Sequence, residues 1–433
     1  MAGGRDSDLL CFRKYGLPFY AASWVPSEKI FLAQRKQKQG SQKEGEEVST
    51  GDGSTALPDA AINSSYLAFA GGGGEGSSGI PNAIVIAEFD FSSNFLSQEP
   101  VAKLRLGADL PYRMAVHPGG EGLICSLPKS CRWFEWDVLE NEGSLKLGLR
   151  SSERVLTQLE DIGQQLAVTF NSEGSLLAVG SEDGYLRVFK WPSMEVILDQ
   201  ADAYSTVKDL DFSSDGKFLV SLGNGGPCRV WDVMSSTVVA SLPKESDEIF
   251  GFCRFSQTSD SNQILYTTAV RDRGGSIISW NTSSWMRVRS KQIVRDPICA
   301  FDVSADGRFL AVGTVEGDIL VINSTDMKVQ TVVRKAHLGL VTTLMFSEDS
   351  RALASASMDS STRVTIIEDQ KRQSGGSMWI VVFIVLIAIL VYFLKTDGAL
   401  PWLWINLLAN YSGVAANLDY WECLHEVSRL QMI

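Results

Sequence analysis

The sequence predicts an all-β fold, a seven-bladed β-propeller, followed by a single C-terminal transmembrane helix. Three observations lead to this fold class. A unit of strand, turn, strand, turn and strand recurs along most of the chain, and its first turn repeats a Ser-Asp-Gly-like sequence. One long apolar run near the C-terminus contains no charged residue. Several short strands at a fixed spacing favour a closed ring of small sheets, whereas a single uncharged run favours one membrane span.

The repeated unit is clearest in four stretches, which begin at Leu166, Leu210, Phe301 and Leu344, and weaker in two, which begin at Met114 and Phe252. The turn glycines Gly174 and Gly216 are 42 residues apart, and Trp231-Asp232 closes one copy. A period of 40 to 45 residues with these features is the signature of WD-repeat propellers. An ordinary β-sandwich has no reason to repeat its turns at a fixed period. The copies predict blades that begin near residues 17, 112, 166, 206, 249, 297 and 341.

The first and last copies are incomplete. In the first, a strand after Pro18 and a strand from Tyr66 are separated by residues 34–61, which are polar, charged and rich in Gly and Ser. This composition predicts a flexible insertion. The last copy supplies three strands and ends at Ile367. The N-terminal residues 9–16 could supply its fourth strand and so close the ring without an open edge.

Composition narrows the class of protein. With 45% apolar and 21% charged residues, the chain can bury a large core. A net charge of −12 argues against a nucleic-acid partner, because phosphate backbones are bound by clustered Lys and Arg. The seven cysteines form no Cys-x-x-Cys pair, which favours reduced thiols in a cytosolic domain. The three histidines, His117, His337 and His425, are scattered, so we expect structural rather than catalytic roles.

The predicted membrane span is residues 378–394, 17 residues without a charge. Lys371 and Arg372 precede it, which favours a cytosolic N-terminal side. Residues 1–372 would then form a cytosolic propeller and residues 395–433 a luminal tail. Within the tail, residues 398–418 are uncharged and rich in aromatic side chains, so an interfacial segment is expected. Asn410 begins the one luminal Asn-x-Ser sequence and is the glycosylation candidate.

A glycine-rich stretch, residues 71–82, stands out in the first blade. It contains six glycines, and Gly74, Gly76 and Gly79 have the spacing of a dinucleotide-binding loop. That loop requires a helix after it, whereas residues 83–89 are a β-branched run typical of a strand. The stretch is therefore predicted to join the second and third strands of the first blade.

The sequence of this stretch, GGGGEGSSGIPN, resembles that of the SEC12-like family, the endoplasmic-reticulum guanine nucleotide exchange factors that start COPII coat assembly. Its members are relatives of the mammalian prolactin regulatory element-binding protein, with a cytosolic seven-bladed propeller and one C-terminal span. The resemblance extends from about residue 15 to residue 394. It implies that the chain resides in the endoplasmic-reticulum membrane and promotes GDP release from the small GTPase of the coat, without covalent chemistry.

The resemblance also assigns roles within the loop. Glu75, Ile80 and Pro81 are the expected GTPase-contacting residues. The family loop holds a potassium ion, for which Asn82 would offer its side-chain carbonyl. The candidates for backbone carbonyl ligands are Gly71, Gly72, Gly73, Gly74, Gly76 and Gly79. One carboxylate, that of Glu75, is too little charge for a calcium cage. Some relatives that assist particular membrane cargo lack this loop, so a non-catalytic scaffold is the alternative function.

Overall fold

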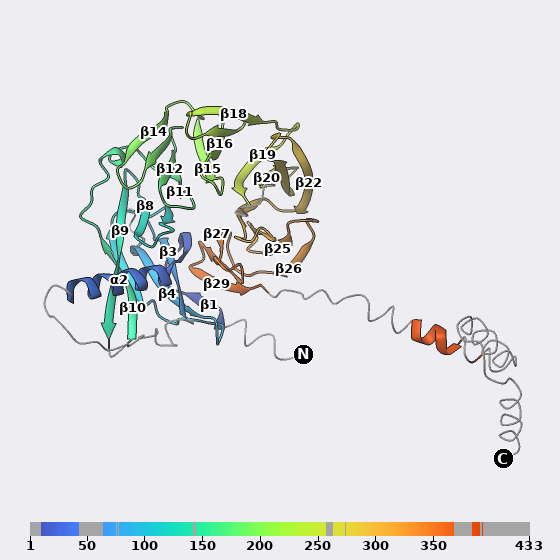
Figure 1. Ribbon diagram of the computed structural model, residues 1–433, viewed down its shortest axis with the longest axis horizontal. Helices are drawn as coiled ribbons and strands as arrows, with labels where there is room; N and C mark the ends of the chain where they lie inside the picture. Colours follow the sequence, from blue (N-terminus) through green and yellow to red (C-terminus); the bar gives the residue numbers. More distant parts are fainter. Residues whose placement is uncertain are drawn as a thin grey trace, which may run out of the picture. The chain divides into compact units, whose positions relative to one another are not determined.

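The computed structural model describes residues 10–42, 64–74, 76, 78–141, 144–256, 263–272, 274–367, 383–389 and 392. Residues 1–367 form one compact unit. Within it, seven antiparallel sheets follow one another around a ring, in the order of the sequence (Figure 1). The predicted seven-bladed propeller is confirmed, and the observed blades begin within two residues of the predicted positions.

The first four blades contain the following strands. Blade 1 comprises β2 (Phe19–Val25), β3 (Ser64–Gly71), β4 (Asn82–Asp90), β5 (Phe95–Leu96) and β6 (Ala102–Gly107). Blade 2 comprises β7 (Arg113–Val116), β8 (Gly122–Ser126), β9 (Cys131–Asn141) and β10 (Ser144–Ser151). Blade 3 follows a 3-10 turn, η1 (Thr157–Leu159), and comprises β11 (Gln165–Phe170), β12 (Leu176–Ser181), β13 (Leu186–Lys190) and β14 (Glu195–Gln200). Blade 4 comprises β15 (Thr206–Phe212), β16 (Phe218–Asn224), β17 (Cys228–Asp232) and β18 (Thr237–Leu242).

The remaining blades repeat this pattern. Blade 5 comprises β19 (Ile249–Phe255), β20 (Ile264–Arg271), β21 (Gly274–Asn281) and β22 (Arg287–Val294). Blade 6 comprises β23 (Ile298–Val303), β24 (Phe309–Thr314), β25 (Ile319–Asn323) and β26 (Val329–Val333). Blade 7 comprises β27 (Val341–Phe346), β28 (Ala352–Ser357), β29 (Ser361–Ile366) and, from the N-terminus, β1 (Phe12–Lys14).

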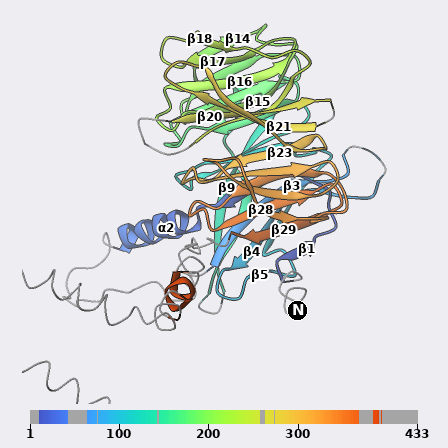
Figure 2. The same cartoon turned by 90° about the vertical axis from the view of Figure 1, so that its right-hand side faces the viewer.

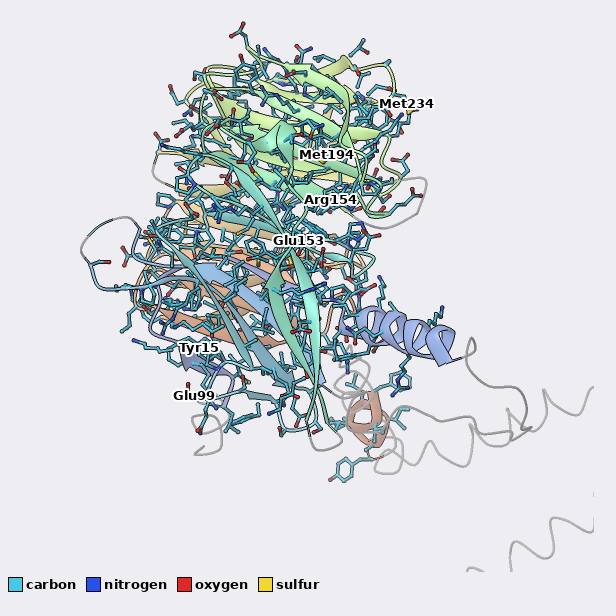
Figure 3. All side chains as sticks on the ribbon, turned by 90° about the vertical axis from the view of Figure 1, so that its left-hand side faces the viewer. Tyr15, Glu99, Glu153, Arg154, Met194 and Met234 are labelled. Carbon is cyan, nitrogen blue, oxygen red and sulfur yellow. The ribbon has the colours of Figure 1, made fainter. Side chains whose placement is uncertain are left out.

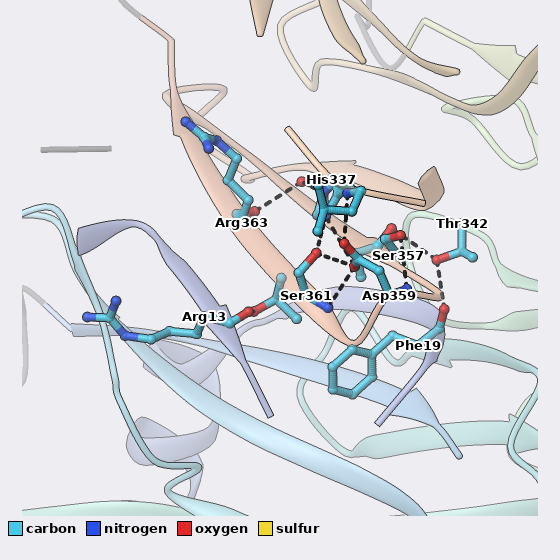
Figure 4. Close-up of polar contacts among 12 residues, drawn as sticks. Arg13, Phe19, His337, Thr342, Ser357, Asp359, Ser361 and Arg363 are labelled. Atoms are coloured by element: carbon cyan, nitrogen blue, oxygen red, sulfur yellow. Dashed lines mark hydrogen bonds and ion pairs between the residues drawn. The ribbon is translucent and has the colours of Figure 1, made fainter. Parts of the chain in front are cut away.

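The N-terminal strand closes the ring, as predicted. β1 pairs antiparallel with β29, with Phe12 opposite Arg363 and Lys14 opposite Ser361. The chain then crosses to the innermost position of blade 1. There, the Thr342 hydroxyl of blade 7 donates to the carbonyl of Phe19 at 2.8 Å (Figure 4). Blade 7 is thus built from both ends of the domain, and β1 occupies its outermost strand position, so that β29 has no open edge.

Burial falls from the centre of each blade to its edge. The second strands β24 and β28 are buried along their whole length, whereas the outermost strands β18 and β22 are largely exposed. The apolar clusters lie between neighbouring blades; Tyr266 and Ile277 of blade 5, for example, pack on Phe301 and Leu310 of blade 6. The core is therefore a set of blade-to-blade layers rather than one central mass. Of the described cysteines, five are buried and Cys299 is half-buried, all as free thiols.

Residues 34–42 correct the predicted insertion. Helix α2 (Ser27–Gln42) follows directly on β2, so the first part of residues 34–61 is helical rather than a flexible segment. The helix forms because Ile30 and Phe31 bury their side chains against blades 1 and 2, and the Ile30 N–H donates to the Pro26 carbonyl at 3.2 Å. Tertiary packing thus outweighs the polar composition of the segment. Residues 43–61 lie outside the described part of the chain.

The predicted membrane span is described only at residues 383–389 and 392, which are helical. No helix within the described residues combines the length and the apolar character that crossing a bilayer requires. The predicted luminal tail, residues 395–433, with Asn410 in it, lies outside the described residues, as does His425.

His337 is a structural histidine. Its ring is buried, and its two nitrogens lie 2.5 Å from the Ser361 hydroxyl and 2.8 Å from the Ser355 hydroxyl, while Asp359 accepts from Ser361 (Figure 4). The ring thereby joins β28, β29 and the connection that follows β26. Burial lowers the pKa of His337 to about 4. The histidine is therefore neutral in the folded protein at neutral pH.

We expect His337→Ala to destabilise residues 1–367 by about 1–3 kcal/mol at pH 7.5, because two buried hydroxyls each lose one of their hydrogen-bond partners. The unfolded state takes up a proton near pH 6.5 and the folded state only near pH 4, so the contribution of His337 is complete above pH 6.5 and falls with the pH. The difference between wild type and variant should therefore narrow by about 2 kcal/mol at pH 5, measured by chemical denaturation. If the free energies of unfolding of wild type and variant changed with pH in parallel, this expectation would be contradicted. The control is Leu338→Ala, at a side chain 80% exposed, which should change neither the free energy of unfolding nor its pH dependence.

Candidate functional site

The glycine-rich loop, residues 72–81, connects β3 to β4 as predicted. It extends from one face of the propeller, which we call the loop face; α2 begins on the opposite face (Figure 2). Its base is attached to the ring closure, because the Gly72 N–H donates to the Pro18 carbonyl at 3.0 Å, directly before β2. No helix follows the loop, so the arrangement that holds a dinucleotide phosphate is absent at this place.

Glycine is required in this loop for two separate structural reasons. At Gly71, Gly72 and Gly73, an added Cβ would collide with the Pro18 carbonyl, the Asn82 side chain and the Ser78 hydroxyl, respectively. Gly74 and Gly79 have open space around them but adopt φ angles of 80° and 72°, which side chains disfavour. The first half of the loop is thus closely packed, and the second half depends on conformational freedom. Glu75 lies outside the described residues.

Asn82 connects the loop to the rest of blade 1. It is buried, its side-chain carbonyl accepts the N–H of Gly74 at 3.0 Å, and its amide nitrogen lies 3.3 Å from the Gly74 carbonyl. The same nitrogen lies 3.1 Å from the carbonyl of Gly107 and 3.0 Å from that of Ala108, beyond the end of β6. One side chain therefore holds two loops together, and its two amide hydrogens face three carbonyl oxygens.

The predicted potassium site can be tested against the oxygen atoms around Asn82. At the base of the loop the carbonyl oxygens of Gly74, Gly107 and Ala108 face the Asn82 amide nitrogen, and the Asn82 carbonyl accepts the Gly74 N–H. Neutral carbonyl oxygens of this kind suit a weakly hydrated cation. Among the described residues no three His, Cys, Asp or Glu side chains are grouped as metal ligands. The residues present therefore fit a monovalent cation better than a divalent one. Gly107 and Ala108 were missed by the sequence reasoning, since nothing in their local sequence indicates a contact with Asn82.

Ile80 and Pro81 are exposed residues of the part of the loop that returns to β4. The Ile80 side chain is 37% exposed, and its N–H donates to the Ser78 hydroxyl at 3.3 Å. An apolar side chain beside a proline, presented on a loop whose base is fixed by Asn82, is suited to contact another protein, because little entropy is lost when it binds. The structure thus brings Ile80, Pro81 and Asn82 into one short segment.

The central channel is a cavity that could also be a site. It has a volume of about 390 Å³ and contains Asp209, Asp211, Asp302 and Arg254 on the innermost strands. Asp209 accepts from Arg254 at 2.6 Å and from the Cys253 N–H at 2.9 Å. Burial raises the pKa of Asp211 to about 7 and that of Asp302 to about 6, although the nearby Arg254 opposes both shifts.

These channel carboxylates have a structural role. Asp211 accepts the N–H of Phe255 at 2.7 Å, and Asp302 accepts that of Phe346 at 2.8 Å. Each bond joins the innermost strand of one blade to that of the next. His117 is structural in the same sense, since its ring contacts the Gly174 carbonyl at 3.0 Å and accepts the Gly119 N–H. The described histidines and channel carboxylates are therefore occupied in holding blades together.

Comparison with known proteins agrees with this architecture. The family model of the anaphase-promoting complex subunit 4 WD40 domain matches residues 168–283, and that of the WD domain, G-beta repeat matches residues 328–364. The chain is 24% identical to guanine nucleotide-exchange factor SEC12 of Mus musculus, over 77% of this chain and 93% of that protein.

Two plant proteins are more similar. SEC12-like protein 1 of Arabidopsis thaliana is 29% identical over 73% of this chain and 80% of its own length. SEC12-like protein 2 of the same plant is 48% identical over 84% of this chain and 90% of its own length. Similarity of this degree over nearly the whole length of both chains shows common descent. The chain therefore belongs to the SEC12-like family.

Proposed function

We propose that this protein is a guanine nucleotide exchange factor, which promotes GDP release and GTP loading on the small GTPase of the COPII coat. The observation that carries the proposal is the loop of residues 72–81, whose base is fixed by Asn82 and whose Ile80 side chain is exposed. The relatives from mouse and rat named guanine nucleotide-exchange factor SEC12 support it, since each aligns over 77% of this chain.

The loop residues would act by binding rather than by covalent chemistry. Ile80 and Pro81 would contact the GTPase, and Asn82 would keep the loop in the conformation that presents them. Glu75, in the same loop, is the third proposed contact. Exchange is accelerated when a factor binds the nucleotide-free GTPase more tightly than the loaded one, because the difference in binding free energy lowers the affinity for GDP.

The loop base is also the proposed potassium site. Asn82 would hold the ion together with backbone carbonyls, among which Gly74, Gly107 and Ala108 are the nearest. A bound cation would attract these carbonyl oxygens in addition to the Asn82 amide and so stiffen the loop. This chemistry requires no carboxylate.

Residues 378–394 are the proposed membrane span. The protein would reside in the endoplasmic-reticulum membrane with its N-terminal propeller in the cytosol. A cytosolic GTPase could then reach the loop. Residues 395–433 would then lie in the lumen. The uncharged run and the preceding Lys371 and Arg372 support this orientation.

Nucleotide release from the purified GTPase tests the exchange activity directly. Residues 1–367 should accelerate release of a fluorescent GDP, and Ile80→Asp should reduce the acceleration at least about tenfold, because a charge would be buried without a partner. The matched control is Val315→Asp, in the corresponding turn of blade 6, which should retain the activity. Binding of the GTPase without any acceleration would instead support the non-catalytic scaffold that assists membrane cargo.

Exchange of the salt tests the ion. Replacing potassium by lithium should slow nucleotide exchange on the GTPase, because the small, strongly hydrated lithium ion does not fit a carbonyl site. The same replacement should speed the amide hydrogen exchange of Gly72, Gly73 and Gly74. Asn82→Ala should lose activity in both salts, whereas Asn224→Ala, at the exposed end of β16 in blade 4, should behave as the wild type. Identical amide exchange in both salts would contradict the potassium site.

Glycosylation tests the topology. If any Asn-x-Ser/Thr sequence is modified in cells, we expect Asn410 alone, because only a luminal asparagine meets the glycosylation machinery. The measurement is a glycosidase-sensitive mobility shift that Asn410→Gln abolishes. A shift abolished by Asn281→Gln or Asn323→Gln would place the propeller in the lumen and would remove the exchange function with it.

A further inference from the structure

Helix α2 (Ser27–Gln42) lies on the face opposite the loop. In blade 1, Phe19 at the start of β2 is paired with Gly71 beside the loop, whereas Val25 at its end is paired with Tyr66. The helix begins two residues after Val25 and extends away from the propeller on that side (Figure 2). Figure 3 shows Met234, in the turn between β17 and β18, on the same side as the helix. We call this side the helix face.

The chain leaves the propeller at the same place. Strand β29 runs from the turn on the loop face to Ile366, and the Ile367 N–H donates to the Arg351 carbonyl at 2.8 Å. Lys29, in the first turn of α2, forms an ion pair of 3.5 Å with Glu348. Glu348 and Arg351 belong to one turn, between β27 and β28. The start of the helix and the exit of the chain therefore lie on the same turn of blade 7.

The helix is basic in an acidic protein. It carries Lys29, Arg35, Lys36 and Lys38 against the single carboxylate of Glu28, whereas the whole chain has a net charge of −12. Lys36 is exposed and Arg35 is half-buried. Neither cation has an ion pair or hydrogen bond among the described residues.

Two apolar side chains of α2 pack on the propeller, whereas a third, Leu32, is 48% exposed. Ile30 and Phe31 are buried, Phe31 packs edge-on against Tyr66, and Ile30 lies against Gly120 of blade 2. An interfacial helix that enters a membrane keeps such an apolar side free for the acyl chains. Because Leu32 alone offers little apolar area, a contact made by α2 through Arg35 and Lys36 would be mainly electrostatic.

We propose that α2 contacts an anionic lipid surface and holds the helix face of the propeller toward the membrane. The choice of partner rests on the proposed span of residues 378–394. The ten residues 368–377 reach about 35 Å at most when extended, so the exit on the helix face keeps α2 close to the bilayer. Cations at such a surface are attracted by the anionic leaflet. The loop face is then turned toward the cytosol.

Vesicle sedimentation of residues 1–367, which contain all seven blades and the closing strand, tests the contact without the span. This fragment should bind phosphatidylcholine vesicles that contain phosphatidylserine, and binding should fall as salt is added. Arg35→Gln with Lys36→Gln should weaken binding about 30-fold, since each cation near such a surface contributes about 1 kcal/mol. The matched control is Lys103→Gln with Arg105→Gln, two exposed cations on β6, which should bind as the wild type.

The outcomes separate this proposal from the exchange activity. Nucleotide release in solution, without vesicles, should be the same for the α2 variant and the wild type, whether or not the protein proves to be an exchange factor. Equal vesicle binding by the α2 variant and the wild type would overturn the proposal. Equal binding to vesicles of phosphatidylcholine alone would overturn it as well, because the contact would then not depend on lipid charge.

Discussion

The pairing of β1 with β29 is the contact on which the rest of the structure depends. Without it, β29 would present an unpaired edge, and blade 7 would be joined to blade 1 only through side-chain contacts. The pairing also fixes the residues that follow β1. Among them is Pro18, whose carbonyl binds Gly72 at the base of the loop. The pairing that closes the ring therefore also fixes the geometry of the candidate site.

Within the site, Asn82 has the central position. It belongs to a strand, so its backbone is held by the sheet, and its side chain bonds to a loop on either side. Because Gly71, Gly72 and Gly73 leave no room for side chains, the first half of the loop can pack on Asn82 and the ring closure. The exposed Ile80 and Pro81 are then presented from a fixed base. This arrangement suits a surface that must bind one state of its partner more tightly than another.

Much of this fold follows from the sequence. The repeated turns predict the positions of all seven blades, and residues 9–16 are predicted to supply the closing strand, which the structure places at Phe12–Lys14. The predicted loop joins the expected strands. These features are local, or repeat at a fixed period, so a single sequence is enough to find them.

Other features depend on contacts between residues that are far apart in the sequence. The polar composition of residues 34–61 concealed the C-terminal part of α2, because that helix is stabilised by Ile30 and Phe31, which precede the polar segment. Pro26, Ser27 and Glu28 are a helix-start signal that could have indicated it. Gly107 and Ala108 reach Asn82 across 25 residues and an intervening strand pair, which no local pattern predicts.

The central claim is that the GTPase binds the face that carries Ile80, Pro81 and Asn82. Hydrogen–deuterium exchange of residues 1–367, with and without the nucleotide-free GTPase, measures this most directly. The account predicts slower exchange in residues 72–81 and in neighbouring turns of the loop face, with α2 unchanged. Protection confined to α2 and the helix face, with residues 72–81 unaffected, would contradict it.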